Sequence, residues 1–327
     1  MKSPRVSLCM IVKNEASTLP RCLASVAGAV DEIVVVDTGS SDGTPSLAQG
    51  LGARVYHAPW TDDFSAPRNA AMDRAKGDWV LALDADEELS PESPRLVREA
   101  VASGAADAFR LAIKNLLPPT ELTSSADTRA VRLYRRSPAF RYEWPIHEQI
   151  RPSIDRARGR VLDCDASIIH YGYLEASAQG ASRVERNRRI LEARLQRDPF
   201  DTWASYHLGF TLKMAGDNLA ARRHLREAVG REGSGLDSDA KARAYTALAQ
   251  IDLALGRNEP AVKSARRALA LDPSNVVAAH VLALALYFSG DVRAAAVVLD
   301  LVRKGASTSP ERSAEIERVL ALISSAA

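Results

Sequence analysis

Short apolar runs alternate with polar loops and helical patterns in the first half of the chain. Residues 6–12 (VSLCMIV) are apolar and rich in β-branched side chains, which predicts a strand, and a helical spacing runs from Ser17 to Val26. Ile33–Val36 forms a second apolar run, and a helical segment over 45–51 follows a turn-rich loop. Because strands and helices alternate, this half is predicted to be an α/β domain with a mostly parallel, Rossmann-like sheet.

Further apolar runs extend this sheet, and polar clusters stand where the expected strands end. The segments KNE, DTGSSDGT and DADEE each follow such a run. Ligands of open α/β sheets bind beyond the carboxyl ends of the strands, so these segments form the candidate site. The additional strands are expected over 55–58, 79–83, 108–113, 131–134 and 166–173, and a helix over 66–76.

The second half of the chain repeats a helical pattern rich in Ala and Leu. Small residues at Gly209, Ala249 and Ala283 mark three equivalent units, and an alanine follows each of them 12 residues later. The last two units are 34 residues apart, the period of the tetratricopeptide repeat, whereas the first two are 40 apart because a Gly- and Ser-rich loop intervenes near 233–238. Three such repeats are enough to bury a stacked core, so an all-α repeat domain is predicted.

Length and composition agree with two globular domains, predicted at residues 1–178 and 179–327. The chain has 327 residues, 46% hydrophobic and 26% charged, as in ordinary folded proteins. The net charge of +2 does not favour nucleic acid as a partner, and no apolar run is long enough to cross a bilayer. Cys9, Cys22 and Cys164 form no CxxC pair, which argues against a disulfide framework or a zinc site. We therefore expect a cytoplasmic protein without a transmembrane segment.

Two acidic residues at the end of the fourth expected strand are candidate metal ligands. Alternate side chains of a strand share one face, so Asp84 and Asp86 can present both carboxylates to one divalent cation. A solvated cap at the end of a strand is the alternative for such a pair. Asp37 ends the second strand, and Arg68 precedes the fourth strand as a fixed cation within reach of a phosphate.

Taken together, CMIVKNE, DEIVVVDTGSSDGT, FSAPRNAAMDRAKGDWVLALDADEEL, PIHEQI and IIHYGY resemble the glycosyltransferase family 2 pattern in its GT-A fold, over about residues 5–175. With the repeats, the chain resembles bacterial family 2 transferases that carry C-terminal tetratricopeptide repeats. That group includes sublancin-type peptide S-glycosyltransferases. Relatives of the same catalytic type glycosylate the lipopolysaccharide core, so the resemblance leaves the acceptor open.

The resemblance implies a nucleotide-sugar site along the first, second and fourth strands. The loop after the first strand and the aspartate after the second would hold the uridine of a UDP-sugar. The arginine would approach the diphosphate, and the first aspartate of DADEE would lie near the ribose and the metal. Asp86 would bind Mn²⁺ or Mg²⁺ directly, and the cation would assist the departure of UDP. The residues implied for nucleotide-sugar binding are Val12, Asn14, Glu15, Asp37, Arg68 and Asp84.

Two later residues complete the site that the resemblance implies. Glu148, in PIHEQI, would be the base that takes the proton of the acceptor in an inverting transfer, and a salt bridge with a nearby arginine is the alternative. His170 would complete the metal site, where an imidazole suits Mn²⁺ better than Mg²⁺, and a structural histidine is the alternative. The aromatic residues Trp60, Tyr142 and Trp144 either pack in the core or face the sugar or acceptor.

We therefore expect an inverting, metal-dependent glycosyltransferase that moves a hexose from UDP-glucose or a UDP-N-acetylhexosamine. The acceptor would be a Ser, Thr or Cys side chain of a peptide or protein, presented partly by the repeats. Two alternatives stay open: transfer to a lipopolysaccharide or other envelope glycan, and an inactive transferase that serves as a repeat scaffold. A homodimer is plausible because repeat domains often pair.

Overall fold

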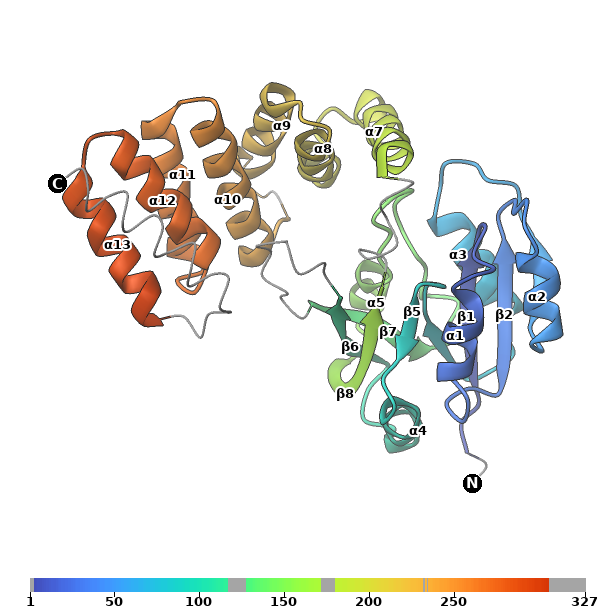
Figure 1. Cartoon of the computed structure of the whole chain (residues 1–327). Helices are drawn as coiled ribbons and strands as arrows, with labels where there is room; N and C mark the ends of the chain where they lie inside the picture. The colour runs from blue at the N-terminus through green and yellow to red at the C-terminus, as the bar shows by residue number, and fades with distance from the viewer. Residues whose placement is uncertain (1–2, 117–127, 172–179, 232, 234, 306–327) are drawn as a thin grey trace. The chain divides into compact units, whose positions relative to one another are not determined.

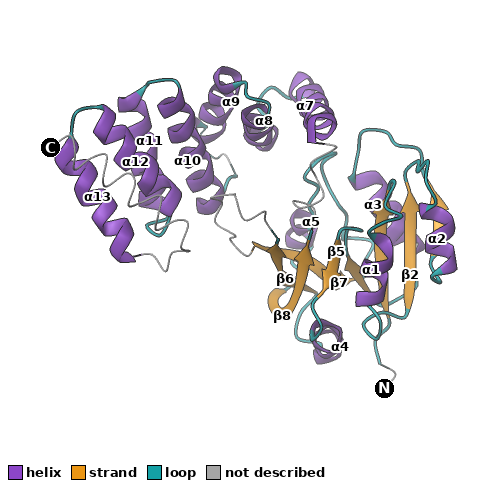
Figure 2. Ribbon diagram, viewed as in Figure 1, coloured by secondary structure: helices purple, strands orange, loops and turns teal. Residues whose placement is uncertain are grey.

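The structure, a computed structural model, divides into two compact units (Figure 1). Unit 1 comprises residues 1–178 and unit 2 comprises residues 179–327. Figure 2 shows strands and helices in unit 1 and helices in the described part of unit 2. Residues 172 and 173, at the end of the last expected strand, lie outside the described part. The residues that the structure describes are 3–116, 128–171, 180–231, 233 and 235–305.

The first four strands of unit 1 form the parallel half of one sheet. Val12 pairs with Asp37 and Asp37 pairs with His57, so these strands end at one edge of the sheet. The apolar runs in the sequence predicted each of these strands to within one residue at either end. Their order is β3-β2-β1-β4, and their bounds are β1 (Val6–Val12), β2 (Glu32–Asp37), β3 (Arg54–His57) and β4 (Trp79–Ala82).

The other half of the sheet is mixed. Four of the seven pairs of described strands are parallel, which confirms the predicted α/β fold with a mostly parallel sheet. β7 (Thr128–Arg135) lies antiparallel between β4 and β6 (Ala108–Asn115). β8 (Val161–His170) runs parallel to β6, and β5 (Glu87–Leu89) lies antiparallel to β8 at the edge. β6 and β7 are consecutive in the chain and adjacent in the sheet, so the chain reverses its direction between them and the two strands are antiparallel. β5 was not predicted, because three residues are too few to show a period.

Helices cover both faces of this sheet. The consecutive residues Leu8, Cys9 and Met10 alternate between two hydrophobic clusters, which therefore lie on opposite faces. The cluster of Leu8 and Met10 includes side chains of three helices, and the cluster of Cys9 includes side chains of two. The first set is α1 (Leu19–Ser25), α2 (Thr44–Gly50) and α4 (Ser93–Ser103), and the second is α3 (Ser65–Arg74) and α5 (Arg151–Arg156). The sequence analysis did not predict α4.

Unit 2 confirms the predicted tetratricopeptide-type repeats. Gly209, Ala249 and Ala283 lie on the first helices of three successive pairs, α8/α9, α10/α11 and α12/α13, and the alanines 12 residues later lie fully buried on the second helices. A Cβ on Gly209 would stand 2.6 Å from Leu225 Cγ, so a glycine is needed at this close approach. The helices are α7 (Gly180–Arg197), α8 (Thr202–Met214), α9 (Asn218–Gly230), α10 (Ser238–Ala254), α11 (Asn258–Leu271), α12 (Val276–Phe288) and α13 (Val292–Gly305).

Gly77 lies just before β4, where a side chain has no room. A Cβ there would stand 2.6 Å from Ser7 Oγ and 2.9 Å from the carbonyl oxygen of Arg5. Gly77→Ala should therefore lower the free energy of unfolding of unit 1 by about 1–3 kcal/mol, measured by urea unfolding with tryptophan fluorescence. Gly50→Ala is the matched control, because nothing lies within 4 Å of its Cβ and we expect a change below about 1 kcal/mol. Equal losses in the two variants would contradict this packing argument.

Candidate functional site

Two loops at the carboxyl edge of the parallel strands are joined by hydrogen bonds. After β1, the Asn14 backbone N–H donates to Ser40 Oγ at 2.9 Å, and the Ser41 backbone N–H donates to Asn14 Oδ1 at 2.7 Å. The Glu15 backbone N–H donates to Thr44 Oγ1 at 2.8 Å. Asn14 has a φ of 60°, a left-handed conformation that asparagine tolerates better than most residues. The structure therefore brings the loop after β1 and the DTGSSDGT loop together as one surface.

Asp37 is buried at the base of this surface. Its carboxylate accepts from the backbone N–H groups of Gly39 and Ser40 at 3.2 Å, from the Ser40 hydroxyl, and lies 3.3 Å from His57 Nδ1. Burial by itself would raise the pKa of Asp37, but these hydrogen bonds outweigh it and lower the pKa. Asp37 is therefore an ionised acceptor at neutral pH.

The other two residues predicted in this region anchor the loop from within. The Val12 side chain is buried, and its carbonyl oxygen accepts from the backbone N–H and the hydroxyl of Thr38 at 3.0 and 3.1 Å. Glu15 Oε2 accepts from the Thr18 hydroxyl at 2.7 Å, next to the start of α1. Both residues hold the shape of the loop that carries Asn14.

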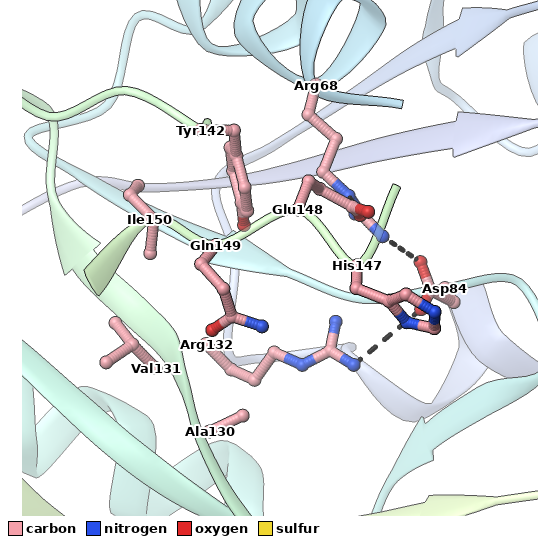
Figure 3. Close-up of a pocket in the computed structure, with 10 residues that line it drawn as sticks. All are labelled: Arg68, Asp84, Ala130, Val131, Arg132, Tyr142, His147, Glu148, Gln149 and Ile150. Atoms are coloured by element: carbon pink, nitrogen blue, oxygen red, sulfur yellow. Dashed lines mark hydrogen bonds and ion pairs between the residues drawn. The ribbon is translucent and has the colours of Figure 1, made fainter. Parts of the chain in front are cut away.

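Arg68 is buried between two carboxylates that come from distant parts of the chain (Figure 3). Its Nη2 donates to Asp84 Oδ1 at 2.6 Å, and its Nε donates to Glu148 Oε1. The guanidinium also lies over the ring of Tyr142, 5.5 Å from the centroid. Glu148 therefore forms the arginine salt bridge that the sequence left as an alternative, and Arg68 holds the two carboxylates in place.

A second buried ion pair, between Arg132 and Glu87, was missed by the sequence analysis. Arg132 Nη2 lies 2.7 Å from Glu87 Oε1 and 3.6 Å from Asp84 Oδ2. Burial raises the pKa of Glu87 to about 7. Burial acts in the same direction on Asp84, but Arg68 and Arg132 more than offset it and hold the Asp84 pKa well below its usual range. The signal available in the sequence was DADEE, which has four acidic residues in five positions. An acidic residue buried in such a cluster needs a cation beside it.

The DADEE segment turns sharply after β4 and separates its two aspartates. The Asp84 backbone N–H donates to Glu87 Oε2 at 2.9 Å, and the Glu87 backbone N–H donates to the Asp84 carbonyl oxygen at 3.1 Å. Asp84 faces the arginines, whereas Asp86 Oδ2 lies 3.3 Å from His170 Nε2. Because both aspartates lie beyond the strand, they do not share a strand face as the sequence predicted. Within the described residues, no group of three or more His, Cys, Asp or Glu side chains is placed to hold a metal ion.

The pair of Asp86 and His170 nevertheless fits a divalent cation. Strand pairing positions it, since His170 on β8 lies opposite Glu87 on β5 and opposite Asn115 on β6. His170 Nδ1 lies 2.9 Å from Asn115 Oδ1, which directs Nε2 toward Asp86. Many metal-binding histidines are oriented in this way by a hydrogen bond at the other ring nitrogen. Two ligands at roughly right angles, each ~2.1 Å from a cation, lie about 3 Å apart, close to the observed spacing.

Charge at His170 responds to the same neighbours. Burial by itself would lower the pKa of this imidazole, but the hydrogen bond to Asp86 and the nearby carboxylates outweigh burial and raise it. A positive charge is therefore favourable at this position. A bound cation would supply such a charge while using the neutral imidazole as a ligand.

The loop that carries Glu148 has an unusual backbone. Trp144 and His147 adopt left-handed φ angles of 74° and 52°, which cost free energy in residues other than glycine. Glu143 and Gln149 close the loop by two backbone hydrogen bonds of 3.0 and 3.1 Å. Burial lowers the pKa of His147, although the Glu148 charge opposes the shift, so this histidine is neutral at pH 7. Strain of this kind recurs at functional sites.

The predicted aromatic residues divide between the core and the site. Tyr142 is buried, belongs to the core cluster of Cys9, and also lines a cavity next to Glu148. Trp60 packs edge-on against Phe64, with ring centroids 4.6 Å apart, and its indole N–H donates to Asp62.

Across the described helices of the chain, none is long and apolar enough to cross a membrane.

Comparison with known proteins finds a family match within the N-terminal unit. Residues 7–152 match the sequence profile of the family described as Glycosyl transferase family 2. This segment includes Arg68, the DADEE turn and Glu148, and it ends before His170.

Three curated relatives show partial likeness. A TPR repeat-containing protein of Synechococcus elongatus is 41% identical over 231 residues, which are 69% of this chain and 56% of that protein. An uncharacterized glycosyltransferase of Rickettsia felis is 42% identical over 88 residues, which are 27% of this chain and 31% of that protein. The glycosyltransferase SunS from the SPbeta prophage of Bacillus subtilis is 22% identical over 231 residues, 69% of this chain and 54% of SunS. The chain spans about half the length of these relatives, or less.

Solved structures show weaker likeness. A crystal structure of Staphylococcus aureus TarS 1–349 in complex with UDP-GlcNAc has 16% identity and a TM-score of 0.43, covering 88% of this chain and 92% of that chain. A crystal structure of MamA has 19% identity and a TM-score of 0.39, covering 44% of this chain and 79% of that chain.

Removal of Arg68 tests the central ion pairs. Arg68→Met leaves Asp84 and Glu148 without their shared cation, and we expect the free energy of unfolding to fall by about 3–5 kcal/mol at about pH 7.5. In the native chain Arg68 helps to lower the pKa of Asp84, so this part of the stability is lost as the pH falls below the usual aspartate range of about 4. The loss caused by Arg68→Met should therefore be smaller at about pH 3 than at about pH 7.5. Urea unfolding at the two pH values measures this difference.

The control for this variant is Arg95→Met. It breaks an exposed pair in which Arg95 Nη1 lies 2.5 Å from Glu99 Oε1, so we expect a loss below about 1 kcal/mol at either pH. A loss in Arg68→Met that is equally small, or that grows on acidification, would contradict the assignment.

Proposed function

We propose that this chain, which carries a glycosyl transferase family 2 domain over residues 7–152, is an inverting, metal-dependent glycosyltransferase. It would move a hexose from a UDP-sugar to a Ser, Thr or Cys side chain of a peptide or protein. The observation that carries this proposal is the arrangement at the carboxyl edge of β4. There Arg68 holds Asp84 and Glu148, and the following residues bring Asp86 to His170.

The joined loops after β1 and β2 would take the uridine of the donor. Asp37 is an ionised acceptor that suits the N–H of uracil or the hydroxyls of ribose, both of which are hydrogen-bond donors. Asn14 and Glu15 shape the neighbouring loop, and their bonds to Ser40 and Thr44 hold it before a ligand arrives. Ordering this surface in advance lowers the entropic cost of binding.

Asp86 and His170 would hold the Mn²⁺ or Mg²⁺ ion. When bound, the cation supplies Lewis-acid stabilisation of the negative charge that develops on the departing diphosphate. Asp84 is engaged by two arginines, so it fixes the turn on which Asp86 stands. The mixed oxygen and nitrogen donor set favours Mn²⁺ over Mg²⁺.

Glu148 would accept the proton of the acceptor group. The Arg68 guanidinium orients one of its oxygens through the hydrogen bond from Nε. Glu148 also lines a cavity in which an acceptor group could meet it. The family resemblance implied that Arg68 approaches the diphosphate. We propose instead that Arg68 acts on the reaction by positioning Glu148.

A peptide acceptor is supported by the repeats of unit 2. Stacked helical repeats present extended surfaces that bind other chains. Several large apolar residues are exposed there, among them Phe200 and Met214, with 78% and 77% of their surface accessible to solvent.

The three cysteines of the chain are free and buried, which suits a reducing compartment, and we place the reaction in the cytoplasm.

Loss of the proposed metal ligand should abolish metal-dependent chemistry. Asp86→Asn weakens the attraction for a cation, so Mn²⁺-dependent hydrolysis of a UDP-sugar should fall by at least about 100-fold, while the circular dichroism spectrum is retained. The measurement is release of UDP with and without Mn²⁺. Asp163→Asn, which alters only an exposed pair with Arg110, is the control and should keep full activity. A folded Asp86→Asn protein with full activity would rule out the metal site.

Replacement of the proposed base should separate binding from transfer. Glu148→Gln keeps the size of the side chain, so UDP affinity measured by calorimetry should stay within about threefold. Transfer to an acceptor should fall by about 10²–10⁴-fold, because the amide cannot take a proton. Glu143→Gln in the same loop is the matched control, since Glu143 pairs with the exposed Arg156. An unchanged transfer rate in Glu148→Gln would mean that another residue is the base. If the native chain does not bind UDP, the alternative of an inactive transferase that serves as a repeat scaffold is favoured.

A further inference from the structure

A cavity of about 190 Å³ lies beside Glu148 and has walls that the roles assigned above do not use (Figure 3). Arg68, Asp84 and Glu148 form one side. The opposite side comes from β7 and the end of the loop after Trp144, and its residues are Ala130, Val131, Arg132, Gln149 and Ile150. This second side decides what kind of molecule the cavity can take.

Arg132 presents hydrogen-bond donors to this cavity. Among the described residues, the structure records polar partners for Nη2 alone, which binds Glu87 and approaches Asp84. Figure 3 shows the other terminal nitrogen directed into the space between Gln149 and His147. A guanidinium has five N–H donors, so Arg132 keeps donors for a ligand after the Glu87 pair has fixed its orientation.

Gln149 faces the same space from the loop. Its backbone is held by the two hydrogen bonds with Glu143, which sets the direction of its side chain. Gln149 is exposed, and within the part of the chain that the structure describes its side-chain amide has no hydrogen-bonding partner. Gln149 and Arg132 line the same cavity (Figure 3). An amide both donates and accepts, so the two residues together match a group with several hydroxyls.

Charges around the cavity are balanced. The described residues that line it include two cations, Arg68 and Arg132, and two carboxylates, Asp84 and Glu148, while burial keeps His147 neutral. Each arginine already contacts a carboxylate within 2.7 Å. A carboxylate on a ligand would therefore be repelled by Asp84 and Glu148, and both arginines are already paired with carboxylates. Neutral hydroxyl or acetamido groups would instead meet hydrogen-bond donors and acceptors.

We propose that this cavity receives the transferred sugar, and that Arg132 and Gln149 are specificity-determining residues for an uncharged hexose. This inference rests on the proposed glycosyltransferase function. The lining combines apolar side chains, such as Val131 and Ile150, with many polar groups, which suits a ligand rich in hydroxyls. Among the described residues, the recorded polar contacts of Arg132 and Gln149 go to Glu87, Asp84 and Glu143, so we assign the two residues to the sugar and not to the nucleotide.

The test compares the affinity for a UDP-sugar with that for UDP alone, by calorimetric titration in Mn²⁺ without an acceptor. Gln149→Leu should weaken binding of UDP-glucose or UDP-N-acetylglucosamine, whichever binds the native chain more tightly, by about three- to tenfold. Its affinity for UDP should stay within about twofold. The double variant Arg132→Met with Glu87→Gln removes the buried pair together, so that no charge is left alone, and should weaken the same sugar by about tenfold or more.

Arg110→Met, which alters only the exposed pair with Asp163 on the same sheet, is the control and should leave both affinities unchanged. Equal losses for UDP and the UDP-sugar in the cavity variants would overturn the inference and leave the proposed function standing. Tighter binding of UDP-glucuronate than of the neutral donors would overturn the assignment to an uncharged sugar. A native chain that binds UDP in neither the presence nor the absence of Mn²⁺ would instead overturn the proposed function itself.

Discussion

The ion pairs of the buried Arg68 hold together the parts of unit 1 that form the site. Arg68 comes from α3, Asp84 from the turn after β4, and Glu148 from a strained loop 80 residues away in the chain. Burying the Arg68 charge is costly, and the cost is offset only while it meets its carboxylates. The guanidinium therefore helps to fix the loop of the candidate base to the parallel half of the sheet, together with the hydrogen bonds between Asn69 and the Tyr142 backbone.

The second arginine explains why the two aspartates of DADEE have different surroundings. Arg132 and Arg68 occupy both oxygens of Asp84, and Glu87 accepts the backbone N–H of the same residue. The turn is thus held by its first aspartate and by the glutamate after it. Its second aspartate can then face His170, which β8 supplies from far along the chain.

The sequence predicted what local patterns encode. β1, β2 and β4 contain apolar runs, and the repeats have a recurring period, so these elements and the polar edge of the sheet could be found without a structure. The three-residue β5 and the pairing of Glu87 with Arg132 could not, because both depend on distant contacts. β5 pairs with residues 79–83 positions further along the chain, and Glu87 meets Arg132 45 positions away. The same limit applied to Glu148, since the residue types allow either a base or a salt bridge. The fold makes the salt bridge and also places Glu148 in the lining of a cavity.

This pairing of charges bears on why the proposed reaction would need a metal ion. A diphosphate arriving at the edge of β4 meets two arginines that already share three carboxylates, so neither guanidinium offers a full positive charge. Leaving-group charge must then be met by another cation, and Asp86 with His170 is the described pair near this edge whose geometry suits one. Because both arginines are engaged in holding carboxylates, the proposed transfer would depend on a bound divalent cation to stabilise the departing diphosphate.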